Sequence, residues 1–177
     1  LVTILLNAVL VGVVPTWIGS GRLDESTLTW GLRSAGALDG HVAHCGFGRV
    51  GSAIGEALET FGIPYVAIET DPDIVKSLRA RNVPAVFGDS AQRVILAAAQ
   101  TDRAALVILA IPESDRARLA VSRIRALNPD APILARVLDA EWRDRLMEAG
   151  GAGGIQPEGE AASDLLRPPL ERLPLAP

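Results

Sequence analysis

The strongest constraint on the fold is a regular alternation of short apolar runs and amphipathic stretches, which begins at His41. Short, nearly continuous apolar runs are typical of strands that are buried on both faces. Strands that alternate with helices predict a parallel sheet covered by helices. The predicted strands are His41–Cys45, Pro64–Glu69, Pro84–Phe87, Ala105–Ile111 and Pro132–Val137. We therefore expect an α/β domain with a Rossmann-like, doubly wound parallel sheet.

The stretches between these runs carry apolar residues at the three- and four-residue spacing of amphipathic helices. One predicted helix has the stripe Val50, Ile54, Ala57, Leu58 and Phe61, and another has Ala117, Ala120, Val121, Ile124 and Leu127. Asp71 and Pro72 predict the N-cap and first position of a further helix. A sixth strand at Ile155 is the poorest match to the pattern, because a glycine-rich segment precedes it.

A glycine motif follows the first predicted strand. The segment CGFGRVG places Gly46, Gly48 and Gly51 in G-x-G-x-x-G spacing at the start of a predicted helix. In such a motif the first glycine permits a tight turn, the second lets a pyrophosphate approach the backbone, and the third lets the helix pack closely on the sheet. Phosphates then bind the free N–H groups at the helix N-terminus. The alternative is that these glycines form only a tight strand-to-helix turn.

An acidic residue occupies the position that a nucleotide-binding site requires. Glu69 ends the second predicted strand, 23 residues after Gly46. A carboxylate there accepts hydrogen bonds from the adenosine ribose and repels a 2′-phosphate, which favours NAD or another adenine nucleotide over NADP.

Other polar residues follow predicted strands at the carboxyl edge of the sheet, where ligands bind in this fold. Arg49 either reaches a phosphate or faces solvent, and Arg136 is either a phosphate contact or an ion-pair partner. Asp89 either lies on the adenine side of the ligand or has an ordinary loop and capping role beside Ser90. Asp71 is better explained as a helix cap than as a ligand contact. His44 falls inside the first strand, where a hydrogen-bonded core histidine is the expected role.

Composition excludes several classes of function. The net charge is −4 and only 4% of residues are aromatic, which argues against a nucleic-acid surface. Cys45 is the single cysteine, so neither a disulfide framework nor a cysteine-based zinc site can form. With only two histidines beside it, we expect no metal site.

Residues 1–21 carry no charge, and residues 1–18 read LVTILLNAVLVGVVPTWI. We interpret residues 1–18 as the end of a transmembrane helix, with Trp17 as an interfacial anchor. A signal peptide and a buried strand–loop segment are the alternatives. Residues 19–39 are rich in glycine, serine and mixed charge, and we expect a linker there. A proline-rich tail is expected at residues 168–177.

The sequence predicts a binding domain rather than an enzyme. The strand–helix repeats stop near residue 157, which leaves too little chain for a substrate domain. There is no phosphate-binding loop of the Walker A type and no Tyr-x-x-x-Lys pair. A fragment of a soluble NAD-dependent oxidoreductase is the alternative.

The segment HVAHCGFGRVGSAIGEALETFGIPYVAIETDPDIV resembles the start of an RCK N-terminal domain, also called the Trk-type nucleotide-binding domain. The similarity continues through VPAVFGDSAQRVILAAA and LVILAIPESDRARLAVSRIRALNPDAPILARVLD, and the expected domain covers residues 40–167. The segment VTILLNAVLVGVVP resembles the last membrane helix of Kef-type monovalent cation/proton antiporters of the CPA2 class. Two features depart from the family: His44 replaces an aliphatic residue, and the glycines before Ile155 replace a more regular strand.

The resemblance implies a cytoplasmic regulatory domain, at the inner membrane, that binds NAD(H) or AMP and gates potassium or other monovalent cation/proton antiport by its own membrane domain. It also implies a homodimer. A stand-alone Trk-like subunit on a separate channel is a further alternative. The expected ligand-binding residues are Gly46, Phe47, Gly48, Arg49, Val50, Gly51, Glu69, Thr70, Asp71, Gly88, Asp89, Ser90, Ile111 and Arg136.

Overall fold

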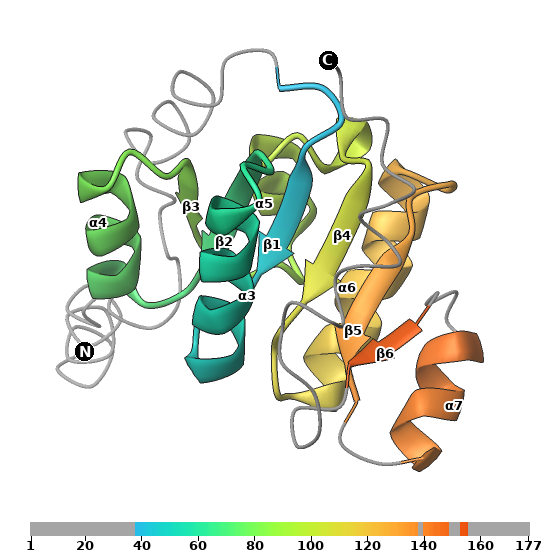
Figure 1. The fold of residues 1–177 in the computed structure, drawn as a ribbon. Helices are drawn as coiled ribbons and strands as arrows, with labels where there is room; N and C mark the ends of the chain where they lie inside the picture. The colour runs from blue at the N-terminus through green and yellow to red at the C-terminus, as the bar shows by residue number, and fades with distance from the viewer. Residues whose placement is uncertain (1–37, 138–139, 149–152, 156–177) are drawn as a thin grey trace, which may run out of the picture.

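The computed structural model describes residues 38–137, 140–148 and 153–155. They form one parallel sheet of six strands in the order β3-β2-β1-β4-β5-β6 (Figure 1). The strands are β1 Val42–Cys45, β2 Tyr65–Glu69, β3 Ala85–Phe87, β4 Leu106–Leu109, β5 Ile133–Arg136 and β6 Gly153–Ile155. The doubly wound parallel sheet predicted from the alternating pattern is therefore confirmed, and the weakly patterned sixth strand is present beside β5.

The helices cover both faces of this sheet (Figure 1). Helices α3 Arg49–Thr60 and α4 Pro72–Ala80 pack on one face, and their buried residues share an apolar cluster. The buried residues of α5 Arg93–Ala98, α6 Ser114–Leu127 and α7 Ala140–Glu148 belong to a second cluster on the other face. A short 3-10 helix, η1 Thr101–Arg103, precedes β4. The chain thus leaves β1 and β4, which are neighbours, toward opposite faces.

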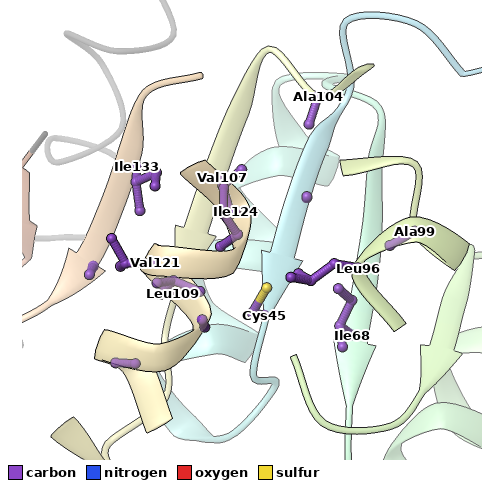
Figure 2. Packing of buried hydrophobic residues seen from close by; sticks show 14 of the residues in the cluster. Cys45, Ile68, Leu96, Ala99, Ala104, Val107, Leu109, Val121, Ile124 and Ile133 are labelled. Atoms are coloured by element: carbon purple, nitrogen blue, oxygen red, sulfur yellow. The ribbon is translucent and has the colours of Figure 1, made fainter. Parts of the chain in front are cut away.

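Side chains alternate between the two clusters along each strand because successive strand residues point to opposite faces. In β1, Ala43 and Cys45 contact the α5–α6 side, whereas Val42 faces α3 and α4. Figure 2 shows Cys45 in the α5–α6 cluster, surrounded by aliphatic side chains of neighbouring strands and helices. In the strand order β1 lies between β2 and β4, which places its end in the middle of the sheet.

One prediction about the helices is wrong. Phe61 was assigned to the buried stripe of α3, but its side chain is 55% exposed. The helix ends at Thr60, and Phe61 is its C-cap, with its N–H bonded to the Ala57 carbonyl at 3.0 Å. Beyond the last helical residue the 3.6-residue period no longer sets the direction of a side chain.

The predicted membrane segment, linker and proline-rich tail lie outside the described residues, and they stay predictions. Within the described ranges, no helix has both the length and the apolar character needed to cross a membrane.

Candidate functional site

The glycine loop connects β1 to α3 and has the geometry that its spacing predicts. Gly46 has φ +89°, a left-handed value that side chains rarely allow, and its N–H donates to the Ile68 carbonyl at 2.8 Å. A Cβ on Gly46 would lie 3.2 Å from the Ala110 carbonyl carbon and 3.3 Å from the Ile111 nitrogen. The turn is therefore packed tightly against the chain that leaves β4.

The other two glycines of the motif have different reasons to lack a side chain. A Cβ on Gly51 would lie 2.0 Å from the Gly46 carbonyl oxygen, so only glycine lets α3 begin this close to the turn. Gly48 is the N-cap of α3 with no side-chain cap, and a Cβ there would meet nothing within 4 Å. The exposed space in front of Gly48 is the position where a phosphate would bind the first N–H groups of α3.

Phe47 is one of the predicted ligand-binding residues, and its side chain anchors the loop in the core. The ring is 7% exposed and fills the space above Gly55, where a Cβ would lie 2.3 Å from its Cζ. It also stacks with Tyr65 at a centroid distance of 6.2 Å and contacts His44 at 5.1 Å. The sequence contains no signal for this role, because it depends on the space that Gly55 of α3 leaves open and on the ring of Tyr65 in β2. The loop is thus held by its own side chain in the core.

Glu69 also holds the loop. Its Oε2 accepts from the Phe47 N–H at 2.5 Å, while Oε1 accepts from the N–H groups of Thr70 and Asp71 at 2.6 and 3.0 Å. The Thr70 hydroxyl donates to the same Oε1 at 3.1 Å. Oε1 is thus engaged by three donors and Oε2 by one. Oε2 is the oxygen with room for a further donor, such as a sugar hydroxyl.

A cleft of about 1000 Å³ lies at the carboxyl edge of the sheet, in front of the glycine loop. It brings together most of the residues predicted from sequence, and these are Gly46, Gly48, Arg49, Val50, Glu69, Thr70, Asp71, Gly88, Asp89, Ser90, Ile111 and Arg136. Phe47 and Gly51 do not line it. Since β1 and β4 send their helices to opposite faces, the cleft lies at the point where ligands bind in doubly wound sheets.

Eight further residues line the cleft and were not predicted. They are Ala53, Ile54, Ile68, Ile74, Ala110, Pro112, Glu113 and Arg116. Most are apolar residues, and four of them, Ile54, Ile68, Ile74 and Ala110, also pack in the core clusters. Arg116 is different, because it is a cation in the first turn of the helix that follows β4. A basic residue at that position, just beyond the end of a predicted strand, was the signal that could have identified it.

The cations and carboxylates that face the cleft are only partly paired. Arg116 Nη2 lies 3.6 Å from Asp89 Oδ2, and Asp89 Oδ1 accepts from the Ala91 N–H at 2.8 Å. Arg136 Nε is buried and has no partner within the described part of the chain. Asp71 is the N-cap of α4, as predicted, and its Oδ1 accepts from the Asp73 N–H at 2.9 Å. The cleft therefore offers guanidinium donors to an anionic ligand.

The other titratable groups near the loop are buried in the core. Burial raises the pKa of the Cys45 thiol to about 12, although a hydrogen bond with Ser90 opposes the shift. Burial and the bond to Glu59 raise the pKa of Tyr65, whose hydroxyl donates to Glu59 Oε1 at 2.7 Å. These groups stay protonated near neutral pH and do not face the cleft.

His44 is a core residue, as predicted, but it is not hydrogen-bonded there. Both ring nitrogens are buried without a partner within the described part of the chain, and burial lowers the pKa of His44 to about 3. The ring packs against both Phe47 and Tyr65 as a neutral aromatic group. The expectation of a hydrogen-bonded histidine was wrong because the rings that it contacts, Phe47 of the glycine loop and Tyr65 of β2, do not bond to its nitrogens.

The described residues also contain no group of three or more His, Cys, Asp or Glu side chains that could hold a metal ion. The sheet order, the tight glycine turn and the cleft at the switch point define a Rossmann-like domain. The chain belongs to the TrkA-N domain family, whose model matches residues 42–155. This finding confirms the family resemblance drawn from the sequence.

Among curated proteins, the chain is 33% identical over 171 residues to YbaL of Escherichia coli, whose name describes a cation/proton antiporter. It is 31% identical over 157 residues to the glutathione-regulated potassium-efflux system protein KefC of Klebsiella pneumoniae. These alignments cover 94% and 87% of this chain but 31% and 25% of the relatives. The chain thus spans less than a third of the length of either relative.

Among solved structures, the chain is similar to the TrkA-N domain of the inner membrane protein YbaL from Escherichia coli. The identity is 35% and the TM-score is 0.67, with 77% of this chain and 98% of the other covered. An AMP-bound Kef domain from Shewanella denitrificans matches at 24% identity, with a TM-score of 0.60 over 74% of this chain and 79% of the other. The GsuK channel bound to NAD matches at 19%, with a TM-score of 0.61 over 67% and 22%. The last two show only that the fold is shared.

Proposed function

We propose that this chain is the nucleotide-binding regulatory domain of a potassium or other monovalent cation/proton antiporter. The observation that carries the binding step is the cleft itself. The uncapped N-terminus of α3 opens into it at Gly48, and the carboxylate of Glu69 lies at the end of the neighbouring strand β2. A helix N-terminus favours phosphate and an acid at the end of β2 favours a ribose with free hydroxyls.

The ligand is an adenine nucleotide of the NAD(H) or AMP type. Relatives of the same fold, named as bound to AMP, ADP and NAD, support this class of ligand. The free capacity of Glu69 Oε2 supports one hydrogen bond from a ribose hydroxyl. The negative charge of Glu69 disfavours a 2′-phosphate, so NADH should bind more tightly than NADPH.

The role is regulation and not catalysis. Neither histidine lines the cleft, and the single cysteine is buried with a raised pKa. Relatives named as cation/proton and potassium-efflux antiporters carry a matching segment within a much longer chain, which supports a domain fused to a membrane transporter. We place this domain on the cytoplasmic side of the inner membrane and expect it to work as a homodimer.

Calorimetric titration of the 177-residue chain with NADH, NAD⁺, NADPH, AMP and ATP tests the binding step. The matched variants are Gly48→Val, whose new side chain would occupy the open space of the cleft, and Glu56→Gln, an exposed change elsewhere on α3. We expect binding of NAD(H) or AMP that Gly48→Val abolishes and Glu56→Gln preserves. A wild-type chain that binds none of the five nucleotides would contradict the proposal.

Regulation is tested in the full-length transporter. Potassium flux into vesicles should change when the nucleotide identified by calorimetry is added, and Gly48→Val should remove that response. The flux through the Glu56→Gln transporter should respond to the nucleotide as the wild-type flux does. Flux that is the same with and without bound nucleotide would show a binding domain without a gating role.

A further inference from the structure

Arg116 lies across the switch point from the glycine loop. It is the third residue of α6, and its side chain lines the cleft. The strands β1 and β4 are paired neighbours, but α3 and α6 leave them toward opposite faces of the sheet. The first turns of α3 and α6 therefore flank the same opening from two sides.

The two sides of this opening are close together. A Cβ on Gly46 would already contact the Ala110 and Ile111 backbone at 3.2 to 3.3 Å, so the loop after β1 and the loop after β4 are in van der Waals contact. An anionic group bound at the N-terminus of α3 would consequently lie beside the first turn of α6. A guanidinium in that turn is well suited to bind phosphate, because its planar donors match two phosphate oxygens.

The present partner of Arg116 is held loosely. The distance from Nη2 to Asp89 Oδ2 is 3.6 Å, and the side chain of Arg116 is 51% exposed. Exposed ion pairs of this kind contribute little to stability. A phosphate, with more charge and a better fork geometry than a single distant carboxylate oxygen, can displace Asp89 at small cost.

The loop that carries Asp89 does not depend on this ion pair. The Gly88 N–H donates to the Glu69 carbonyl at 2.9 Å, and Arg123 of α6 donates to the Ala91 carbonyl. Ser90 is buried and hydrogen-bonded with the Cys45 thiol. Release of Arg116 would therefore leave the loop between β3 and α5 in place, and loss of the Arg116 side chain should not unfold it.

We propose that Arg116 is a phosphate-binding residue of the cleft. In the free protein Asp89 holds the Arg116 side chain, and it releases that side chain when a nucleotide phosphate binds. This inference rests on the proposed nucleotide-binding function and adds to it a residue and an exchange of partners. Asp89 then acts as a competitor of the phosphate. Its removal should strengthen the binding of phosphate-bearing nucleotides and leave nucleosides unaffected.

The test compares AMP with adenosine by calorimetry on the 177-residue chain and three variants. Arg116→Gln removes the cation, and Asp89→Asn removes the competing charge while an amide oxygen can still accept from the Ala91 N–H. Arg118→Gln is the matched control, because Arg118 is exposed on the same helix and does not line this cleft.

Arg116→Gln should weaken AMP binding about tenfold, as expected for a charged hydrogen bond. Asp89→Asn should tighten AMP binding by about two- to fivefold, the range of an exposed ion pair. Adenosine binding should be unchanged in both variants, and Arg118→Gln should match the wild type. Equal effects of Arg116→Gln on AMP and adenosine would indicate a structural role and overturn the inference.

Two further outcomes separate this inference from the proposed function. Normal AMP binding by Arg116→Gln would refute the role of Arg116 while leaving nucleotide binding intact. Weaker binding of both AMP and adenosine by Asp89→Asn would show that Asp89 contacts the nucleoside directly, which would refute the exchange. A wild-type chain that binds neither AMP nor NAD⁺ would refute the proposed function and this inference together.

Discussion

At the scale of single residues, the loop is positioned by groups that do not face the ligand. Phe47 inserts its ring above Gly55, Glu69 accepts from the Phe47 N–H, and His44 fills the space beneath. A loop held from below in this way needs little rearrangement to bind phosphate. Preorganisation of this kind reduces the entropy that binding would otherwise lose.

His44 makes folding sensitive to acid. Its pKa is lowered to about 3 in the folded chain and is near 6.5 when unfolded. The unfolded state therefore takes up a proton below pH 6.5 that the folded state cannot, so stability is complete above pH 6.5 and falls as the pH decreases toward 3. Between pH 7.5 and 5.0 this single group should lower the free energy of unfolding by about 2 kcal/mol.

Urea denaturation of the wild type and His44→Leu at several pH values measures this effect. The variant should lose most of the decrease in stability below pH 6.5. A residual dependence should remain from His41, whose pKa burial also lowers. An identical pH dependence in both proteins would show that His44 does not remain neutral in the folded state.

The residue roles that sequence could predict were those fixed by local backbone geometry. Gly46 and Gly51 have the conformation and close packing that their spacing requires. The ion pair of Arg116 with Asp89 could not be predicted, because it joins α6 to the loop between β3 and α5, and only the order of the strands brings these two segments together. The unpaired ring of His44 depends in the same way on which side chains the glycine loop and β2 place beside it.

At the scale of elements, strands were predicted more accurately than helix ends. A central strand is buried on both faces, so its whole length is marked by apolar residues. A helix end is marked only by its cap. Asp71 provides such a mark for α4, whereas the N-cap of α3 is Gly48, which has no side chain to cap the helix, and its C-cap is Phe61.

The cap of α4 can be tested directly. Asp71→Ala should lower the free energy of unfolding by about 1 kcal/mol, because the N–H groups of Asp73 and Ile74 lose their acceptor. Asp71→Asn keeps an acceptor oxygen and should cost much less. Chemical denaturation of the three proteins provides the comparison. Equal losses in the two variants would mean that charge, and not the capping hydrogen bond, is what stabilises the start of α4.

At the scale of the whole molecule, the cleft is the meeting point of two cores. Residues of the α3–α4 cluster and of the α5–α6 cluster both contribute to its lining, for example Ile54 and Ile68. A ligand that fills the cleft would contact groups supported by both faces of the sheet. Binding should therefore stabilise the domain as a unit.

Thermal unfolding should show this stabilisation. At a concentration of AMP or NADH one hundred times its dissociation constant, the free energy of unfolding should increase by about 2.7 kcal/mol. Gly48→Val should unfold at the same temperature with and without nucleotide, while Glu56→Gln should respond as the wild type does. A nucleotide that raises the melting temperature of Gly48→Val as much as that of the wild type would be bound at another site.

The two outer strands of the sheet, β3 and β6, are each only three residues long. An outer strand leaves one row of amide groups unpaired, and a long exposed row can recruit strands from other molecules into aggregates. Short outer strands offer few such groups. Longer variants of β3 or β6 should for this reason be poorer in colloidal stability, so the shortness of both edges protects the domain against aggregation.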